Sequence, residues 1–220
     1  MISFDFMAVL AEWPLLLKGL AWTLGLTLIA TPLGLIIATL GAWSRASGPV
    51  WLRRVLGAYV ELLRNTPFIV QLFFIFFGLP AAGVKLSPEA ASLIAMTLNL
   101  GAYGTEILRS GIQATPRGQW EAAQSLALSF GEQLRHVVLP QALRIGVPPT
   151  VGFLVQVIKG TALASVIGFV ELTKAGSMIS NATYQPFLVY ACVALLYFVL
   201  CFPVSLVAQS LERKLHGNRH

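Results

Sequence analysis

The sequence predicts an all-α integral membrane protein with about five transmembrane helices, and three observations carry this prediction. The chain of 220 residues is 56% hydrophobic and only 11% charged, with a mean hydropathy of +0.76. This balance lies outside that of soluble globular domains. Its apolar runs approach the roughly 20 residues that cross a bilayer core. Its lysines and arginines gather in the short segments between those runs.

The expected helices make up one domain over residues 1–220. We expect them at about residues 15–42, 56–80, 88–112, 146–170 and 187–211, with a polar loop at about 115–140. We expect the first run to be a mature helix, because its first basic residue, Lys18, follows two acidic residues, unlike the cationic start of a signal peptide. Cys192 and Cys201 fall on different faces of the fifth helix, which predicts no disulfide.

The distribution of lysine and arginine predicts the orientation, because short cytoplasmic loops carry the excess of positive residues. One side holds Arg45, Arg53, Arg54, Arg109, Arg117, Arg135, Arg144, Arg213, Lys214 and Arg219. The other side holds Lys18, Lys85 and Lys174. We therefore expect the N-terminus outside the cell, the C-terminus in the cytoplasm and the 115–140 loop on the cytoplasmic face.

Several other kinds of site are excluded. The net charge of +6 does not indicate nucleic-acid binding, because the basic residues form no stripe with aromatic residues between them. His136, His216 and His220 have no ligand spacing with acidic or thiol partners, so no metal site is expected. The chain has no phosphate-binding loop of the form G-x-x-x-x-G-K-S/T. Any work that this protein does therefore draws its energy from another chain.

Two pairs of opposite charges lie in the second and third helices. Placing a polar group inside a bilayer is unfavourable in free energy, so such groups usually face a cavity or each other. Glu61 and Arg64 are three residues apart, so they are placed to form an ion pair along one helix face. Glu106 and Arg109 have the same spacing. A structural role and a gating role are both open for these pairs.

The second helix also carries a polar stretch around Pro67. Asn65, Thr66 and Gln71 extend its polar face. Pro67 invites a local break, and a carbonyl group freed there could line a cavity. The stretch therefore indicates a polar path through the membrane.

Lys159 is expected well inside the bilayer. About 14 apolar or neutral residues precede it and about 11 follow it, at a helical rise of ~1.5 Å per residue. Gly160 and Thr161 beside it favour an unwound stretch that lines a cavity. The alternative is that the ammonium group snorkels to the interface, or that it pairs with Glu61 or Glu106.

The polar loop begins with the signals of a helix. Thr115 offers an N-cap, and Pro116 takes the first helical position, where its missing N–H costs nothing. The helix should run to about Ala127. It presents small side chains that a partner's backbone could approach, with hydrogen-bonding groups at the rim: Ala122, Ala123 and Ala127, with Glu121 and Gln124. The alternative is an ordinary amphipathic helix at the membrane interface.

A second short helix should follow in the loop. Ser129 and Glu132 have the capping-box spacing, in which the hydroxyl and the carboxylate satisfy each other's backbone donors. This helix should end near Pro140. The two helices should meet in an angled elbow at Leu128–Ser129.

These segments resemble the permease subunits of bacterial ABC importers, in particular the polar amino acid permease family of the histidine, glutamine and arginine type. The family's signature loop begins Glu-Ala-Ala, has a glycine four residues after the second alanine and ends in Leu-Pro. Glu121-Ala122-Ala123 and Leu139-Pro140 match it, and Ala127 stands at the position of the glycine. The resemblance covers nearly the whole chain, through the blocks Tyr59–Pro67, Gln71–Phe74, Tyr103–Glu106, Arg109–Ile112 and Lys159–Gly168.

The resemblance implies a type I (MetI-like) permease fold in the inner membrane of a bacterium, with the loop as a coupling helix seated in a groove of an ATPase. It implies two ATPase subunits, a second permease, identical or homologous, and an extracytoplasmic binding protein that delivers the amino acid. No cofactor is expected in this chain, because ATP and Mg would be bound by the partner ATPase. The chain would then have no enzymatic activity of its own.

The resemblance also assigns roles to residues. Coupling to the ATPase would fall to Glu121, Ala122, Ala123, Gln124, Ala127 and Ser129. The substrate path would combine the polar residues of the second helix with the segment that the family uses for amino acid recognition: Glu61, Arg64, Asn65, Thr66, Gln71, Lys159, Gly160, Thr161, Ala162, Leu163 and Ser165. Gly160 stands where many relatives carry an acidic or amide residue, which removes an obvious partner for a cationic substrate.

Two other functional classes compete with this interpretation. A secondary transporter usually carries internal repeats and more helices, and no second copy of any polar block is present in the sequence. A membrane enzyme needs a nucleophile, a base and an orienting group together, and no such set emerges. The sequence therefore favours the importer permease.

Overall fold

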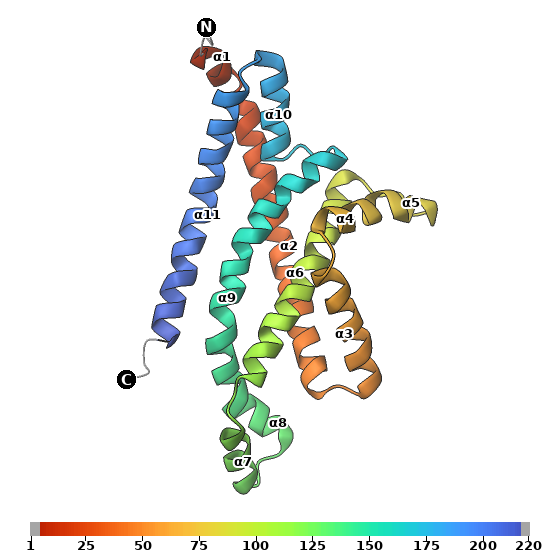
Figure 1. Ribbon diagram of the computed structural model, residues 1–220, viewed down its shortest axis with the longest axis vertical. Coiled ribbons are helices and arrows are strands. Elements are labelled where there is room, and N and C mark those ends of the chain that lie inside the picture. Colours follow the sequence, from red (N-terminus) through yellow and green to blue (C-terminus); the bar gives the residue numbers. More distant parts are fainter. Residues whose placement is uncertain (1–4, 217–220) are drawn as a thin grey trace. The chain divides into compact units, whose positions relative to one another are not determined.

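The computed structural model describes residues 5–216, and no strand occurs among them, which confirms the all-α class (Figure 1). The α-helices are α1 (Phe6–Ala11), α2 (Trp13–Ser47), α3 (Val50–Arg64), α4 (Phe68–Phe73), α5 (Leu79–Ala81), α6 (Pro88–Gln113), α7 (Arg117–Ser125), α8 (Phe130–Glu132), α9 (Leu139–Gly160), α10 (Leu172–Thr183) and α11 (Pro186–His216). Two π-helical turns, η1 (Phe74–Gly78) and η2 (Gln133–Val138), and the 3₁₀-helix η3 (Thr161–Ile167) link some of them. Arg219 and His220 lie outside the described residues.

Within residues 5–216, three helical segments are long and apolar enough to cross a membrane: Trp13–Ser47, Phe130–Ile167 and Pro186–Leu215. A fourth span results if the broken pair Val50–Arg64 and Phe68–Ala81 counts as one. The remaining helix of the five expected is α6. Its 26 residues are enough to cross a bilayer. It carries Glu106 and Arg109, so its composition alone does not mark it as a span.

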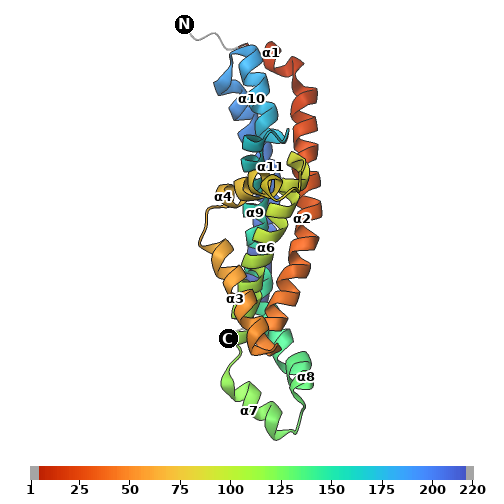
Figure 2. The same ribbon diagram turned by 90° about the vertical axis from the view of Figure 1, so that its right-hand side faces the viewer.

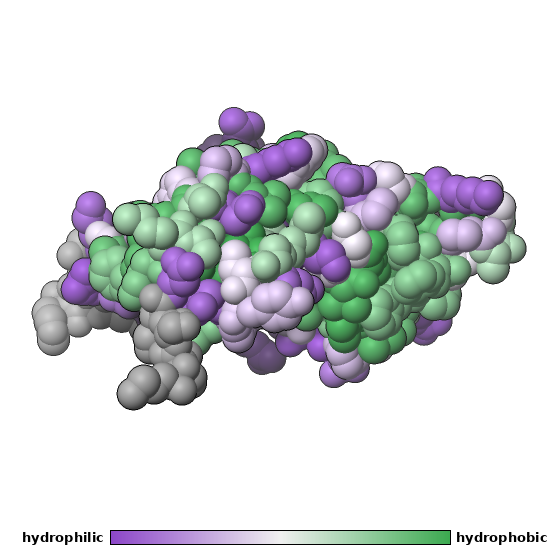
Figure 3. Space-filling view, turned by 90° about the horizontal axis from the view of Figure 1, so that it is seen from above, coloured by the Kyte–Doolittle hydropathy of each residue, from purple (hydrophilic) through white to green (hydrophobic). Residues whose placement is uncertain are grey.

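Many large hydrophobic side chains are exposed on these helices, among them Leu28, Leu40, Phe74, Leu195 and Phe198. In Figure 3, hydrophobic residues form broad areas of the visible face, with hydrophilic residues between them. Large exposed apolar patches mark surfaces that contact a membrane or a partner. The exposed apolar faces are therefore those expected of helices that contact lipid.

The chain divides into two compact units, and the first comprises Met1–Pro32, Thr66–Thr97 and Val155–Pro203. One buried hydrophobic cluster of this unit packs α1 and the start of α2 against α10 and the start of α11 (Figure 1, Figure 2). The buried residues of this cluster are Val9, Leu16, Leu172, Ile179, Leu188, Val189 and Val193. Gly19 permits the close approach of α2 and α10, because a Cβ atom there would lie 2.8 Å from that of Ala175.

The second unit comprises Leu33–Asn65, Leu98–Leu154 and Val204–His220. In it, α2 and α6 cross closely, because a Cβ atom on Gly104 would lie only 2.6 Å from that of Ala38. Small residues allow such backbone approach between membrane helices. The hydroxyl of Tyr59 on α3 donates to the carbonyl of Leu98 on α6 at 2.6 Å, which fixes the third helix of this group.

Candidate functional site

The loop between α6 and α9 belongs to the second unit, and in both views α7 and α8 continue beyond the ends of those two helices (Figure 1, Figure 2). α7 begins one residue later than expected, because Pro116 is its N-cap and Arg117 its first helical residue. Thr115 therefore does not cap the helix. Its side chain is buried, and within residues 5–216 its Oγ1 has no hydrogen-bond partner. A residue that precedes proline is steered away from helical backbone angles, which places Thr115 outside α7.

All but one of the residues predicted to couple to the ATPase are exposed, and the exception is Ala123. Ala123 is 3% exposed, because α7 packs on η2, so it is unavailable to a partner. The remaining predicted coupling residues are exposed: Glu121, Ala122, Gln124, Ala127 and Ser129. Leu126, which sequence reasoning missed, is 75% exposed. Leu126 therefore adds an apolar side chain to the exposed surface of this loop.

Ala127 closes α7 in the left-handed region, with a φ of 54°. Its N–H donates to the carbonyl of Gln124 at 2.8 Å. The N–H of Leu128 donates to the carbonyl of Ala123 at 3.2 Å, which completes a Schellman motif. Gly83 closes α5 in the same way, with a φ of 86°. The elbow between the helices is thereby confirmed, and its backbone geometry explains why glycine suits the position of Ala127.

Replacing Ala127 by glycine should stabilise the closed elbow by about 1 kcal/mol, because a left-handed backbone costs other residues roughly 1–2 kcal/mol. Hydrogen exchange at the Leu128 amide, which closes the motif, measures this change and should slow by about fivefold. Ala122→Gly is the matched control, since that exposed alanine lies inside α7 and glycine there should destabilise the helix by about 1 kcal/mol. Faster exchange in both variants would contradict the proposed strain at Ala127.

The capping box at the start of α8 is confirmed. The Glu132 carboxylate accepts hydrogen bonds from the Ser129 backbone N–H at 2.8 Å and from its hydroxyl at 2.6 Å. The prediction that this helix ends near Pro140 is wrong, because η2 leads directly into α9. The N–H of Leu139 donates to the carbonyl of Leu134, five residues back. This wider turn lets the helix continue past a proline that lacks its own N–H.

An ion-pair cluster joins α2 and α6 in the second unit. The predicted pair of Glu106 and Arg109 is confirmed, with Arg109 Nε donating to the carboxylate at 2.9 Å. Arg45 of α2 also donates to Glu106 at 2.7 Å, which sequence reasoning missed. Only 17–22% of each of these side chains is exposed. One carboxylate therefore holds two guanidinium groups and fixes α2 to α6.

The other expected ion pair does not form, because among the described residues Glu61 is bonded to Asn65 and not to Arg64. The amide of Asn65 donates to the Glu61 carboxylate at 2.9 Å and to its backbone carbonyl at 2.8 Å, which satisfies the end of α3. The Arg64 guanidinium lies 5.9 Å from the centre of the Tyr103 ring, a cation–π distance. Tyr103 in turn stacks on Phe153 of α9 at 4.7 Å.

The expected break at Pro67 is confirmed, since α3 ends at Arg64 and α4 begins at Phe68 with Pro67 as its N-cap. On the α4 side, in the first unit, Gln71 is buried and its amide donates to the carbonyl and hydroxyl of Thr66, both at 3.0 Å. These two predicted path residues thus satisfy polar groups that the break exposes.

The prediction that the segment after Lys159 is unwound is wrong, because the chain stays helical there and tightens. α9 ends at Gly160 and continues as the 3₁₀-helix η3. Thr161 is fully buried, with its hydroxyl donating to the Ile158 carbonyl at 2.7 Å. The other predicted residues of this segment keep some exposure: Lys159 is exposed, and Gly160, Ala162, Leu163 and Ser165 are half-buried.

A buried polar cluster that sequence reasoning missed supports η3. Glu171 is the N-cap of α10, with its carboxylate accepting from the backbone N–H groups of Thr173 and Lys174 at 2.8 Å each. The Tyr197 hydroxyl of α11 also donates to it at 2.8 Å. That hydroxyl lies 3.4 Å from the hydroxyl of Thr161. The cluster thus ties η3, α10 and α11 together around a carboxylate that is 0% exposed.

The structure brings some predicted path residues together within the first unit. α4, which carries Gln71, packs on η3. Leu72 and Ile167 belong to one buried cluster. A Cβ atom on Gly160 would lie 3.9 Å from the ring of Phe68. The broken helix and the recognition segment are therefore neighbours in this unit.

The comparisons with known proteins identify the class. A family model described as "Binding-protein-dependent transport system inner membrane component" matches residues 13–217. The chain is 40% identical over 204 residues to the L-cystine transport system permease protein TcyB of Bacillus subtilis (strain 168), covering 92% of this chain and 87% of that protein. It is 33% identical over 216 residues to the glutamine transport system permease protein GlnP of Escherichia coli (strain K12), covering 97% and 99%.

Solved structures agree with this class. The crystal structure of an amino acid ABC transporter with histidines matches with a TM-score of 0.91 and 34% identity, covering 97% of this chain and 100% of that chain. The MetNI methionine ABC transporter, at 22% identity and a TM-score of 0.72, supports the fold alone. The chain therefore belongs to the family of binding-protein-dependent transport system inner membrane components, and its fold is that of a type I ABC importer permease.

Proposed function

We propose that this chain is the permease subunit of an ATP-driven importer that takes up a polar amino acid delivered by an extracytoplasmic binding protein. The names of the cystine and glutamine permeases support an amino acid as the substrate. The proposal rests on the segment between α6 and α9 that contains α7 and α8, called the α7–α8 loop below. This loop exposes Glu121, Ala122 and Leu126 in a chain of this family. This loop is the coupling element, and a groove of a separate ATPase receives it.

The partners follow from the same proposal. Two ATPase subunits bind ATP and Mg, and this chain holds no cofactor and no ATPase site of its own. A second permease, identical or homologous, completes the path through the lipid bilayer. The family description supports the binding protein and the inner membrane location.

The proposed orientation places the N-terminus outside and the C-terminus in the cytoplasm of a multi-pass protein of the bacterial inner membrane. The arginines near the loop support it, because cytoplasmic segments carry the positive excess. Arg45, Arg53, Arg109 and Arg117 all belong to the second unit, which holds α7 and α8.

The proposed substrate path keeps the residues expected from the sequence, with a narrower role for some of them. Ala162, Leu163 and Ser165 are half-buried, so their side chains can face a cavity. The side chain of Thr161 is buried, so it stabilises η3 and does not face the path. The packing of α4 on η3 supports a path wall that both segments form.

Glu121→Lys in the reconstituted importer tests the coupling role. Reversing this exposed charge should lower ATP-driven amino acid uptake and ATPase association by at least about tenfold, which corresponds to ~1.4 kcal/mol of binding free energy. Uptake of labelled cystine and glutamine, and co-purification of the ATPase, measure the two effects.

The matched control for this variant is Glu12→Lys, an equal charge reversal at an exposed residue that caps the end of α1. It should leave uptake and association unchanged. Equal uptake in the two variants, with the ATPase still bound to both, would remove the loop from the coupling mechanism.

A further inference from the structure

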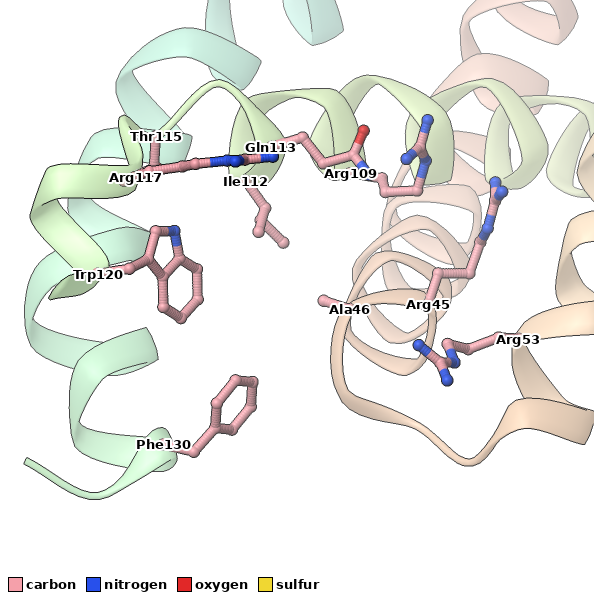
Figure 4. Close-up of a pocket in the computed structure, with 10 residues that line it drawn as sticks. All are labelled: Arg45, Ala46, Arg53, Arg109, Ile112, Gln113, Thr115, Arg117, Trp120 and Phe130. Carbon is pink, nitrogen blue, oxygen red and sulfur yellow. The ribbon is translucent and has the colours of Figure 1, made fainter. Parts of the chain in front are cut away.

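A basic pocket of about 490 Å³ opens between the α2–α3 turn and the α7–α8 loop, within the second unit (Figure 4). Arg45, Arg53 and Arg109 line one side of it. Thr115, Arg117, Trp120 and Phe130 line the other side (Figure 4). The rings of Trp120 and Phe130 are stacked there, with their centres 6.1 Å apart. The coupling role of the loop makes no use of this pocket.

The charge of the pocket is unbalanced. Arg45 and Arg109 share the single carboxylate of Glu106. Arg53 and Arg117 have no acidic partner within ion-pair distance in the part of the chain that the structure describes. Four guanidinium groups against one carboxylate therefore leave an excess of positive charge around the cavity.

Two unsatisfied features lie beside the same cavity. The Oγ1 atom of Thr115 is buried without a hydrogen-bond partner among residues 5–216, although a buried hydroxyl normally has one. The N-terminus of α7 has no side-chain cap and no acidic residue in its first turn, and Arg117 occupies its first position. A cation at the first position opposes the helix dipole. An anion in the pocket would offset the charge of Arg117 and would interact favourably with the uncapped N-terminus of α7.

Exposed tryptophans place the pocket mouth at a membrane interface. Trp43, two residues before Arg45, is 50% exposed, and Trp51, two residues before Arg53, is 65% exposed. Tryptophan gathers at the level of the lipid headgroups. Basic pockets at this level, between helices on the cytoplasmic side, bind anionic headgroups. The anion nearest to this mouth is therefore a lipid phosphate.

We propose that this pocket binds the phosphate group of an anionic phospholipid. The headgroup phosphate lies between Arg53 and Arg117, with the Thr115 hydroxyl donating to one of its oxygens. It thereby ties the α2–α3 turn to the first turn of the coupling loop. The inference rests on the proposed function only in placing the pocket at the cytoplasmic leaflet.

The test measures lipid binding by the full chain, purified in neutral detergent. Added short-chain phosphatidylglycerol should raise its unfolding temperature, whereas phosphatidylcholine, whose phosphate is balanced by choline, should not. Arg53→Gln and Arg117→Gln should each weaken the apparent affinity for phosphatidylglycerol by about fivefold. Thr115→Val, nearly equal in shape, should also weaken it, because the hydroxyl donor is lost.

The matched control is Arg54→Gln, which removes an exposed neighbour that does not line the pocket. Equal weakening by Arg53→Gln and Arg54→Gln would show diffuse surface charge and overturn the proposal. Equal stabilisation by inorganic phosphate and by phosphatidylglycerol would assign the site to free phosphate instead of lipid. Loss of ATPase association in Arg53→Gln, with lipid binding unchanged, would make the pocket a protein interface. Because binding is measured without ATPase or amino acid, its failure leaves the importer assignment intact.

Discussion

Glu106→Ala should lower the free energy of unfolding by about 2–3 kcal/mol, because a partly buried carboxylate that holds two charged groups is lost. The Glu106 carboxylate holds the guanidinium groups of Arg45 and Arg109, and only 18% of the glutamate side chain is exposed. Alanine would leave these two like charges close together, with no carboxylate between them. Denaturant unfolding of the purified chain in detergent measures the loss, and ATP-driven uptake should fall with it.

Two further variants separate the ion pair from general effects of mutation. Glu61→Ala removes an exposed carboxylate that is bonded to Asn65, and its cost should stay within about 0.5–1 kcal/mol. Glu106→Gln keeps the shape and a hydrogen-bonding oxygen, so its cost should fall between the two. Equal stability of the Glu61→Ala and Glu106→Ala variants would contradict a structural role for the cluster.

Glu171→Ala should cost about 3–4 kcal/mol, because it combines the loss of an N-cap with the exposure of unsatisfied buried donors. The fully buried carboxylate accepts from the backbone N–H groups of Thr173 and Lys174 and from the Tyr197 hydroxyl. Its removal should also loosen η3, which the Tyr197 hydroxyl contacts at Thr161. The free energy of unfolding and hydrogen exchange at Thr173 and Lys174 measure the two effects.

Tyr197→Phe provides the comparison for this variant. It removes one donor to the carboxylate and leaves the N-cap in place, so it should cost only about 1 kcal/mol and leave exchange at Lys174 nearly unchanged. A loss in Glu171→Ala no greater than that in Tyr197→Phe would mean that the carboxylate does not organise the cluster.

The parts of the fold that depend on neighbouring residues were predictable from the sequence. The apolar composition indicated membrane helices, Pro67 indicated the break, and Ser129 with Glu132 indicated the capping box. Ala127 stood out as a substitute for glycine, and its positive φ now supplies the reason. Gly168 closes η3 in the same left-handed region, with a φ of 90°, and there the residue is the glycine that this backbone favours.

The parts that depend on distant residues were not predictable. Arg45 and Glu106 are 61 positions apart, and Glu171 and Tyr197 are 26 apart, so no local spacing connects them. Glu61 and Arg64 had the spacing of an ion pair, yet the carboxylate accepts from the amide of Asn65, four residues further on. Which of several possible partners a side chain bonds to depends on the tertiary packing around it. For the same reason, the burial of Ala123 on η2 could not be foreseen.

The coupling role requires the α7–α8 loop to lie on the cytoplasmic side of the membrane, and thiol labelling measures its side. A chain with Cys192 and Cys201 replaced by serine and with Gln124→Cys offers one thiol at an exposed position of α7. We expect an impermeant maleimide to label this thiol in inside-out vesicles but not in intact cells, and we expect bound ATPase to protect it. Labelling in intact cells would contradict the claim that an ATPase holds this loop from the cytoplasm.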